Sequence, residues 1–202
     1  KFALSFLYDL LGASQEHRVQ PKGFVEVDID EVLLGSTNEP EYVKLKEKPE
    51  MEALRARIIK LDVPYSLEVR NEVKVYQKFF TEKRRGGKHL APHTIETAAF
   101  WALLTRVEKP QKSDIDRRGK VKLYNGQIVS GFNDYSIKEL MLESEREGMQ
   151  GISPRYIHDK LSAAFMSSEN KNCVNFFVVL KELREGLRTH PHIKSTEMRN
   201  DY

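Results

Sequence analysis

Residues 91–107, which read "APHTIETAAFWALLTRV", decide the fold of this chain. Their apolar side chains cover nearly every face of a helix, a pattern typical of a helix that is buried on all sides. Apolar residues at helical spacing continue upstream, at Val69, Val73, Tyr76 and Phe80. They return near the C-terminal end, at Phe176, Val179, Leu180, Leu183 and Leu187. We therefore predict a mainly α fold in which several helices pack around residues 91–107.

The first part of the chain favours a few strands. Residues 24–34, "FVEVDIDEVLL", alternate between apolar and polar side chains and then run into a continuous apolar segment at 32–34. This pattern predicts a short exposed strand followed by a buried one. Residues 58–65, "IIKLDVPY", alternate again and predict a further strand, which Pro64 ends. The predicted fold class is mainly α with a few strands, an α/β remnant that precedes a helical bundle.

Residues 108–135 are polar and contain glycine, so we expect an insertion in the helical part. Within them, "VKLYNGQIV" places Asn125-Gly126 between alternating apolar residues, which predicts a β-hairpin. The expected domains are an α/β part at 1–66, a helical part at 67–190 and a flexible tail at 191–202. The chain opens without Met in an apolar segment, and its α/β part is small for a complete sheet. We therefore expect a fragment of a longer polypeptide.

Composition narrows the class of protein. The 202 residues include 40% hydrophobic residues and carry a net charge of +3, which is too small to imply nucleic acid as a partner. The lone cysteine, Cys173, excludes an internal disulfide and a cysteine-based zinc site. His89 and His93 have no carboxylate to complete a metal site, so none is expected. No apolar run approaches the roughly 20 residues that span a bilayer. These features favour a cytoplasmic protein.

Two polar residues in the α/β part are candidates for a site. Asn38 follows the predicted buried strand, and the carboxyl ends of strands are where open α/β sheets bind ligands. The alternative is that Asn38 caps a helix that begins at Pro40. Arg57 closes a short predicted helix and could act as an arginine finger on a transferring phosphoryl group. Its alternative role is to cap that helix at its C-terminal end.

The third candidate is Arg155, in "EGMQGISPRYIHDKL" (residues 147–161). Ser153 suits an N-cap and Pro154 suits the first helical position, so Arg155 lies in the first turn of a helix. A cation is unfavourable at this positive end of the helix dipole. Arg155 therefore either pairs with Glu145 or Glu147, or faces an anion together with the helix end. The sequence contains no GxxxxGK[ST] loop and no protein kinase signature.

The order of these three residues resembles sensor 1, arginine finger and sensor 2 of AAA+ ATPases. Several longer phrases also resemble the PrkA family, bacterial serine protein kinases with an AAA+ ATPase domain. They are "FLYDLLGASQEH", "STNEPEY", "EALRARIIKLDVPY", "EVKVYQKFF", "APHTIETAAFWALLTRVEKP", "KLYNG" and "EREGMQGISPRYI". The resemblance covers nearly all of residues 1–190.

The resemblance implies a partial P-loop AAA+ core in residues 1–66, followed by a helical lid. Asn38 is implied to position the attacking water and Arg57 to reach a neighbouring subunit's nucleotide. Arg155 is implied to contact the γ-phosphate. ATP and Mg²⁺ are the cofactors expected in the intact protein, with protein substrates and self-association as its partners.

The resemblance also implies that the Walker A and Walker B motifs lie upstream. The fragment alone is therefore expected to be inactive and to bind no cofactor. Two alternatives remain open. One is an ATP-driven remodeller without kinase activity, and the other is a non-catalytic helical interaction module.

Overall fold

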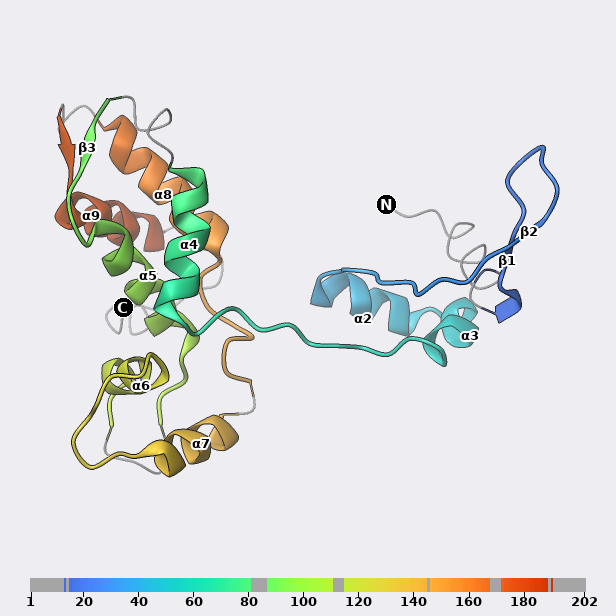
Figure 1. Cartoon of the computed structure of the whole chain (residues 1–202), viewed down its shortest axis with the longest axis horizontal. Helices are drawn as coiled ribbons and strands as arrows, with labels where there is room; N and C mark the ends of the chain where they lie inside the picture. The colour runs from blue at the N-terminus through green and yellow to red at the C-terminus, as the bar shows by residue number, and fades with distance from the viewer. Residues whose placement is uncertain are drawn as a thin grey trace. The chain divides into compact units, whose positions relative to one another are not determined.

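The computed structural model describes residues 13, 15–80, 87–110, 115–144, 146–167, 172–188 and 190. The chain divides into two compact units, Lys1–Leu61 and Asp62–Tyr202, and each is described by itself. Helices dominate the described residues and strands are short, which confirms the predicted mainly α fold class (Figure 1).

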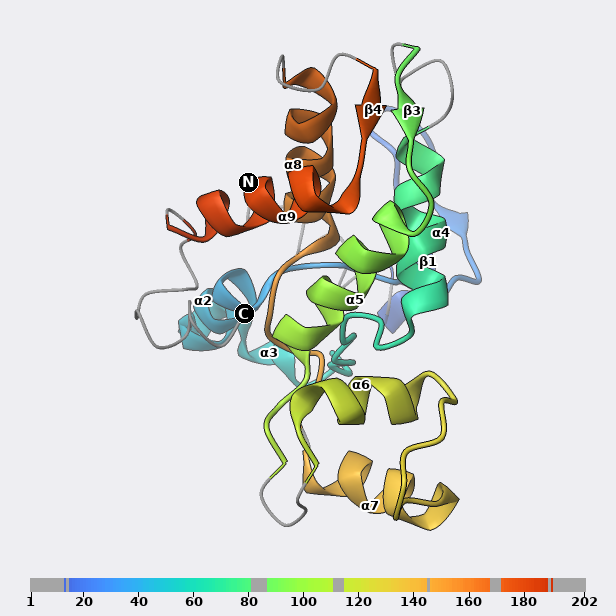
Figure 2. The same cartoon turned by 90° about the vertical axis from the view of Figure 1, so that its left-hand side faces the viewer.

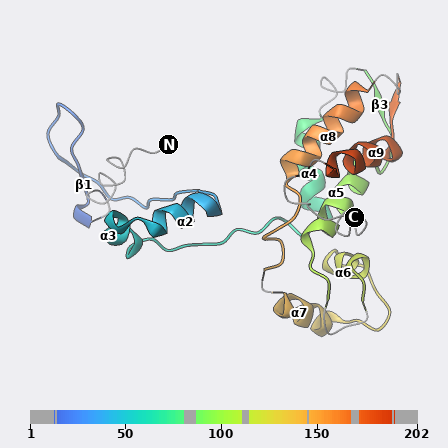
Figure 3. The ribbon, with the colours of Figure 1, turned by 180° about the vertical axis from the view of Figure 1, so that it is seen from behind.

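The first unit contains one small sheet and a group of short helices. Strands β1 (Arg18–Val19) and β2 (Val27–Asp28) pair antiparallel. The Arg18 guanidinium donates to the Asp28 carboxylate across this pair at 2.9 Å. The helical segments follow in sequence: α2 (Glu39–Glu47), the 3₁₀ turn Pro49–Met51 and α3 (Glu52–Arg55). Figure 3 shows these elements from behind.

The buried strand predicted at 32–34 and the strand predicted at 59–63 do not form. Both segments have neither helix nor strand structure, and their apolar side chains are exposed, with Leu34 at 91% and Ile59 at 85%. A strand persists only where neighbours accept its backbone hydrogen bonds and cover its apolar face. Among the described residues, no strand lies beside either segment. The predicted exposed strand appears only as β2.

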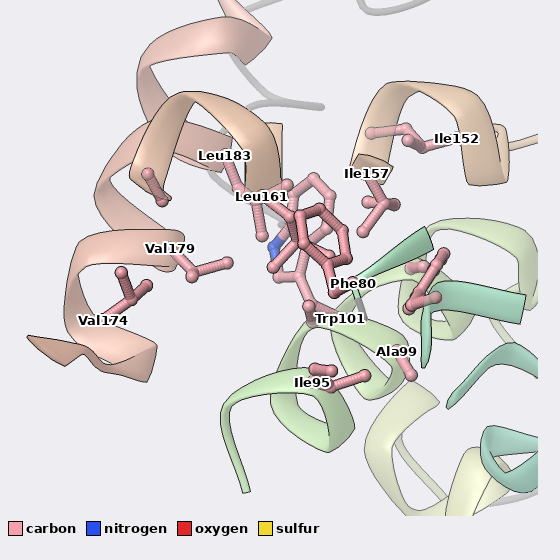
Figure 4. Packing of buried hydrophobic residues seen from close by; sticks show 14 of the residues in the cluster. Phe80, Ile95, Ala99, Trp101, Ile152, Ile157, Leu161, Val174, Val179 and Leu183 are labelled. Carbon is pink, nitrogen blue, oxygen red and sulfur yellow. The ribbon is translucent and has the colours of Figure 1, made fainter. Parts of the chain in front are cut away.

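The second unit is built around a buried helix, as predicted. Helix α5 (Thr94–Arg106) packs with α4 (Val69–Phe79), α8 (Pro154–Met166) and α9 (Phe176–Leu187), as Figure 2 shows. Ala98, Ala99 and Ala102 of α5 have no exposed surface, and their small side chains let neighbouring helices approach. Figure 4 shows Trp101 of α5 beside Phe80 and Leu161 in this core. A short parallel pair, β3 (His89–Leu90) and β4 (Cys173–Val174), joins the ends of distant segments.

The hairpin predicted around Asn125-Gly126 is wrong, because this segment is the end of a helix. Helix α6 (Arg117–Tyr124) begins at Asp116, whose carboxylate accepts from the Gly119 amide at 2.7 Å. It ends at Asn125, and Gly126 follows with φ of +73°. An Asn-Gly pair that supplies positive φ terminates a helix as readily as it makes a hairpin turn.

Helix α7 (Asp134–Glu143) begins at the end of the predicted insertion, with Asn133 and Ser136 forming a capping box at its start. Ile115 and Leu123 of the insertion form a small core with Leu140 of α7. Residues 108–135 therefore contain helix α6, the beginning of α7 and, among the described residues, no strand.

Candidate functional site

Asn38 caps helix α2. Its side-chain oxygen accepts a hydrogen bond from the Glu41 amide at 3.1 Å, and Pro40 stands in the first turn. Both Glu39 and Glu41 lie in that turn, where acidic side chains interact favourably with the positive end of the helix dipole. The capping alternative is therefore confirmed as the contact that Asn38 makes. Its role in positioning a water stays a prediction.

Arg57 follows helix α3 and binds back to it. Its guanidinium donates to the Ala53 carbonyl at 2.5 Å, which is the C-terminal contact expected of a structural arginine. The neighbouring Arg55 donates in the same way to the Lys46 carbonyl. Arg57 is exposed, as is Asn38, and no hydrogen bond among the described residues joins the two side chains. The arginine-finger role of Arg57 stays a prediction.

Arg155 lies where the sequence predicts it, in the first turn of α8. Ser153 caps the helix by accepting from the Tyr156 amide at 3.4 Å, and Pro154 begins it. The Arg155 side chain is exposed, and within the described part of the chain it forms no hydrogen bond or ion pair. Arg155 is therefore an arginine at a positive helix end without a described carboxylate partner.

One of the two carboxylates proposed as a partner of Arg155 is engaged elsewhere. Glu147 pairs with the Lys120 ammonium at 2.8 Å and accepts from the Tyr124 hydroxyl at 2.7 Å. It also accepts from the Glu108 amide at 2.9 Å. The other carboxylate, Glu145, lies outside the described residues. The pairing of Arg155 with Glu147 is therefore wrong, because the Glu147 carboxylate binds Lys120 and Tyr124 instead.

The Lys120–Glu147 cluster is almost completely shielded from solvent. The Lys120 side chain has no exposed surface, and that of Glu147 is 6% exposed. Lys120 also donates to the Ser144 hydroxyl at 2.9 Å. Burial and the hydrogen bond to Glu147 together raise the pKa of Tyr124 above its ordinary value, so this hydroxyl stays protonated as a donor. The cluster fastens the segment after α7 to helix α6.

A second buried ion pair lies beneath the start of α8. Arg106, the last residue of α5, pairs with Glu72 of α4 at 2.7 Å, and the two side chains are 0% and 3% exposed. Its Nε donates to the Ile152 carbonyl at 3.1 Å, and one Nη donates to the Ser66 carbonyl at 3.0 Å. Sequence reasoning missed this arginine. The available signal was a charged residue at the end of an otherwise apolar helix.

Two glycines let the segment before α8 approach α5 closely. Gly151 has φ of +115°, and a Cβ there would lie 2.6 Å from the Thr105 carbonyl oxygen. Gly148 has φ of +76°; its amide donates to the Arg106 carbonyl, and its carbonyl accepts from the Tyr65 amide. Neither close approach leaves room for a side chain. The "GMQG" spacing before α8 is the sequence signal for this arrangement.

Two features of the described residues bear on the class of site. They contain no group of three or more His, Cys, Asp or Glu side chains arranged to hold a metal ion. Among them, no helix combines the length and the apolar character that crossing a bilayer requires.

The chain matches two family models in succession. Residues 1–114 match the PrkA AAA domain, and residues 119–202 match the PrkA serine protein kinase C-terminal domain. The chain belongs to the PrkA family. This confirms the resemblance found in the sequence.

Two curated relatives of this PrkA chain carry different functional names. The "ATP-dependent protease PrkA" of Bacillus subtilis (strain 168) is 38% identical over 192 residues, which are 95% of this chain and 30% of that protein. The "Serine/threonine kinase YeaG" of Escherichia coli (strain K12) is 28% identical over 192 residues, covering 90% of this chain and 29% of that protein. The chain thus spans about 30% of the length of these relatives. No solved structure matches it significantly.

The two PrkA segments share one core. Ala98 and Trp101 of α5 belong to the AAA match, whereas Leu161 and Leu183 belong to the C-terminal match, and all four lie in the same hydrophobic cluster. Asn38, Arg57 and Arg106 fall in the AAA segment, and Arg155 falls in the C-terminal segment. The start of α8 therefore rests on residues of the AAA segment.

Proposed function

We propose that this chain is the phosphate-sensing part of a PrkA-type, ATP-dependent serine protein kinase, with Arg155 directed at the γ-phosphate of ATP. The observation that carries the proposal is the exposed Arg155 guanidinium at the N-terminal end of α8. Helix N-termini and arginines both favour phosphate, and the two coincide here. The PrkA AAA match supports a nucleotide as the source of that phosphate.

In this proposal, the exposed apolar segments of the first unit belong to the AAA core. Val32, Leu34, Ile59 and Leu61 are between 77% and 91% exposed, although their sequence patterns are typical of strands. Covering such segments requires neighbouring strands and helices. The remaining length of the PrkA protein is their proposed source, and it also supplies the loop that holds the triphosphate and the ligands of Mg²⁺.

Asn38 and Arg57, which both lie in the first unit, have proposed roles of their own. Asn38 positions the attacking water, and Arg57 reaches the nucleotide of a neighbouring subunit when the protein self-associates. Both residues are exposed. Asn38 accepts from the Glu41 amide, and the Arg57 guanidinium contacts the Ala53 carbonyl and the Gln15 side chain.

The alternative function is ATP-driven remodelling or breakdown of proteins, which the name of the Bacillus subtilis relative favours. The Ser144–Lys120 contact invites comparison with a serine–lysine hydrolase pair. However, Lys120 is paired with the Glu147 carboxylate at 2.8 Å and donates to the Ser144 hydroxyl at 2.9 Å. Ser144 is also only 6% exposed. These contacts support a structural role for the pair.

The kinase proposal predicts transfer of phosphate to protein serine. The longer protein should be incubated with ATP labelled on its γ-phosphate and a mixed protein substrate such as casein, and phosphoserine should be measured alongside released phosphate. We expect label on serine, and we expect the Arg155→Ala variant to lose it together with ATP turnover. Hydrolysis without any label on protein, accompanied by cleavage of casein, would favour the alternative.

A further inference from the structure

Arg106 occupies a junction between three segments of the second unit. A guanidinium carries five N–H groups, and here each has an acceptor. One Nη donates to the Ser66 carbonyl and to Glu72, the other donates to Glu72 and to the Ile152 carbonyl, and Nε donates to the Ile152 carbonyl. Arg106 itself lies on α5. It therefore joins α5 to α4, to the segment before α4 and to the residue before the cap of α8.

The contact with Ile152 fixes the position of the first turn of α8. The Ile152 carbonyl accepts from Arg106 at 3.0 and 3.1 Å, and its amide donates to the Thr105 hydroxyl at 3.0 Å. The Ile152 side chain is 1% exposed. Ser153, the N-cap, follows directly, and Arg155 is two residues further. The start of α8, which carries Arg155, is thus held by hydrogen bonds to both the backbone amide and the backbone carbonyl of the buried Ile152.

The contact with Ser66 fixes the segment that enters the second unit. Residues 62–68 lead from the unit boundary to α4, and the Ser66 carbonyl accepts from Arg106 at 3.0 Å. The Tyr65 ring lies 4.8 Å from the Arg106 guanidinium carbon, a cation–π contact. The Tyr65 amide donates to the Gly148 carbonyl at 2.8 Å. A shift of this segment therefore disturbs the hydrogen bonds of the same guanidinium that contacts Ile152 before α8.

We propose that Arg106 is a positioning residue that couples the connecting segment 62–68 to Arg155 at the start of α8. The inference rests on the proposed role of Arg155 toward the γ-phosphate. A displacement of the connecting segment changes the geometry at Arg106, which moves Ile152 and with it the first turn of α8. The nucleotide state sensed at Arg155 and the position of the connecting segment are then linked through one buried side chain.

The direct test uses Arg106→Lys in the longer PrkA protein. Lysine keeps the charge but has only three donors and no planar fork, so it cannot hold Ser66, Glu72 and Ile152 together. We expect the kcat of ATP hydrolysis to fall about tenfold, because small misplacements of a catalytic group have effects of this size or larger. We expect the KM for ATP to change less than kcat, because Arg155 acts on the γ-phosphate.

A double-mutant cycle separates positioning from general damage. In the Arg155→Ala background, Arg106→Lys should lower kcat by less than about twofold. The two effects are not additive if Arg106 influences turnover only by positioning Arg155. Lys120→Met is the matched control, since it breaks the buried Lys120–Glu147 ion pair. Assayed well below its unfolding temperature, it should leave kcat within about twofold of the parent protein.

Three outcomes would overturn the inference. The first is an unchanged kcat in folded Arg106→Lys, and the second is a full additional loss in the Arg155→Ala background. The third is an unchanged kcat in Arg155→Ala itself, which removes the proposed function as well. Should Arg106→Lys fail to fold, Thr105→Val tests whether the position of Ile152 matters for Arg155. It removes the hydroxyl that accepts from the Ile152 amide and donates to the Ala102 carbonyl, and its effect should again vanish in the Arg155→Ala background.

Discussion

Arg155→Ala in the longer PrkA protein is expected to lower ATP hydrolysis by about tenfold or more, which corresponds to about 1.4 kcal/mol of transition-state stabilisation. Arg155 is exposed at the start of α8, where the helix dipole already favours an anion. In the function proposed above, the guanidinium there stabilises the charge that develops on the γ-phosphate during its transfer. Steady-state turnover at saturating ATP measures the effect.

Two variants sharpen this prediction. Arg155→Lys keeps the charge without the planar fork and should recover only part of the turnover. Arg184→Ala removes another exposed arginine, on α9, and should leave turnover unchanged. Equal loss in Arg184→Ala and Arg155→Ala would show a nonspecific electrostatic effect. Full turnover in a folded Arg155→Ala protein would remove its phosphate-sensing role.

The second large effect concerns stability. Glu147→Ala is expected to lower the free energy of unfolding by about 3–5 kcal/mol, because it leaves the Lys120 ammonium buried without its carboxylate. The Lys120 side chain has no exposed surface from which water could replace Glu147. The same change leaves the Tyr124 hydroxyl and the Glu108 amide without their acceptor. Chemical unfolding of the chain, followed by circular dichroism, measures the loss.

The matched control removes both charges. In Lys120→Met combined with Glu147→Leu, apolar side chains of similar volume fill the same space, and such replacements are often close to neutral. We expect the double variant to recover most of the stability that Glu147→Ala loses. If the double variant is as unstable as the single one, the hydrogen bonds of Glu147 to Tyr124 and Glu108 matter more than its pairing with Lys120.

Local patterns in the sequence predicted the helical part of the fold well. The all-round apolar surface of residues 91–107 indicated a buried helix, and α5 is that helix. Ser153 and Pro154 marked the start of α8 because capping depends only on neighbouring residues. The strands predicted from the apolar patterns around 32–34 and 59–63 were wrong. A strand needs neighbouring strands to accept its backbone hydrogen bonds, and the local pattern does not specify these neighbours. The hairpin predicted at Asn125-Gly126 was wrong because the positive φ that such a pair supplies occurs both in hairpin turns and at the ends of helices.

The candidate site was predictable only in part. Asn38, Arg57 and Arg155 could be located because each stands at the end of a predicted element. The contacts that hold α8 could not, since the partners of Arg106 lie 34 to 46 residues away in sequence. No local pattern joins Ser66, Glu72 and Ile152. Their convergence depends on how α4, α5 and α8 pack.

A structure of the longer PrkA protein with a non-hydrolysable ATP analogue and Mg²⁺ tests the proposed contact of Arg155 with the γ-phosphate most directly. The measured quantity is the distance from the Arg155 guanidinium nitrogens to the γ-phosphate oxygens. We expect a distance of about 2.7–3.2 Å, the range of a direct hydrogen bond. A bound nucleotide with Arg155 paired to Glu145, or pointing into solvent away from the phosphates, would contradict it.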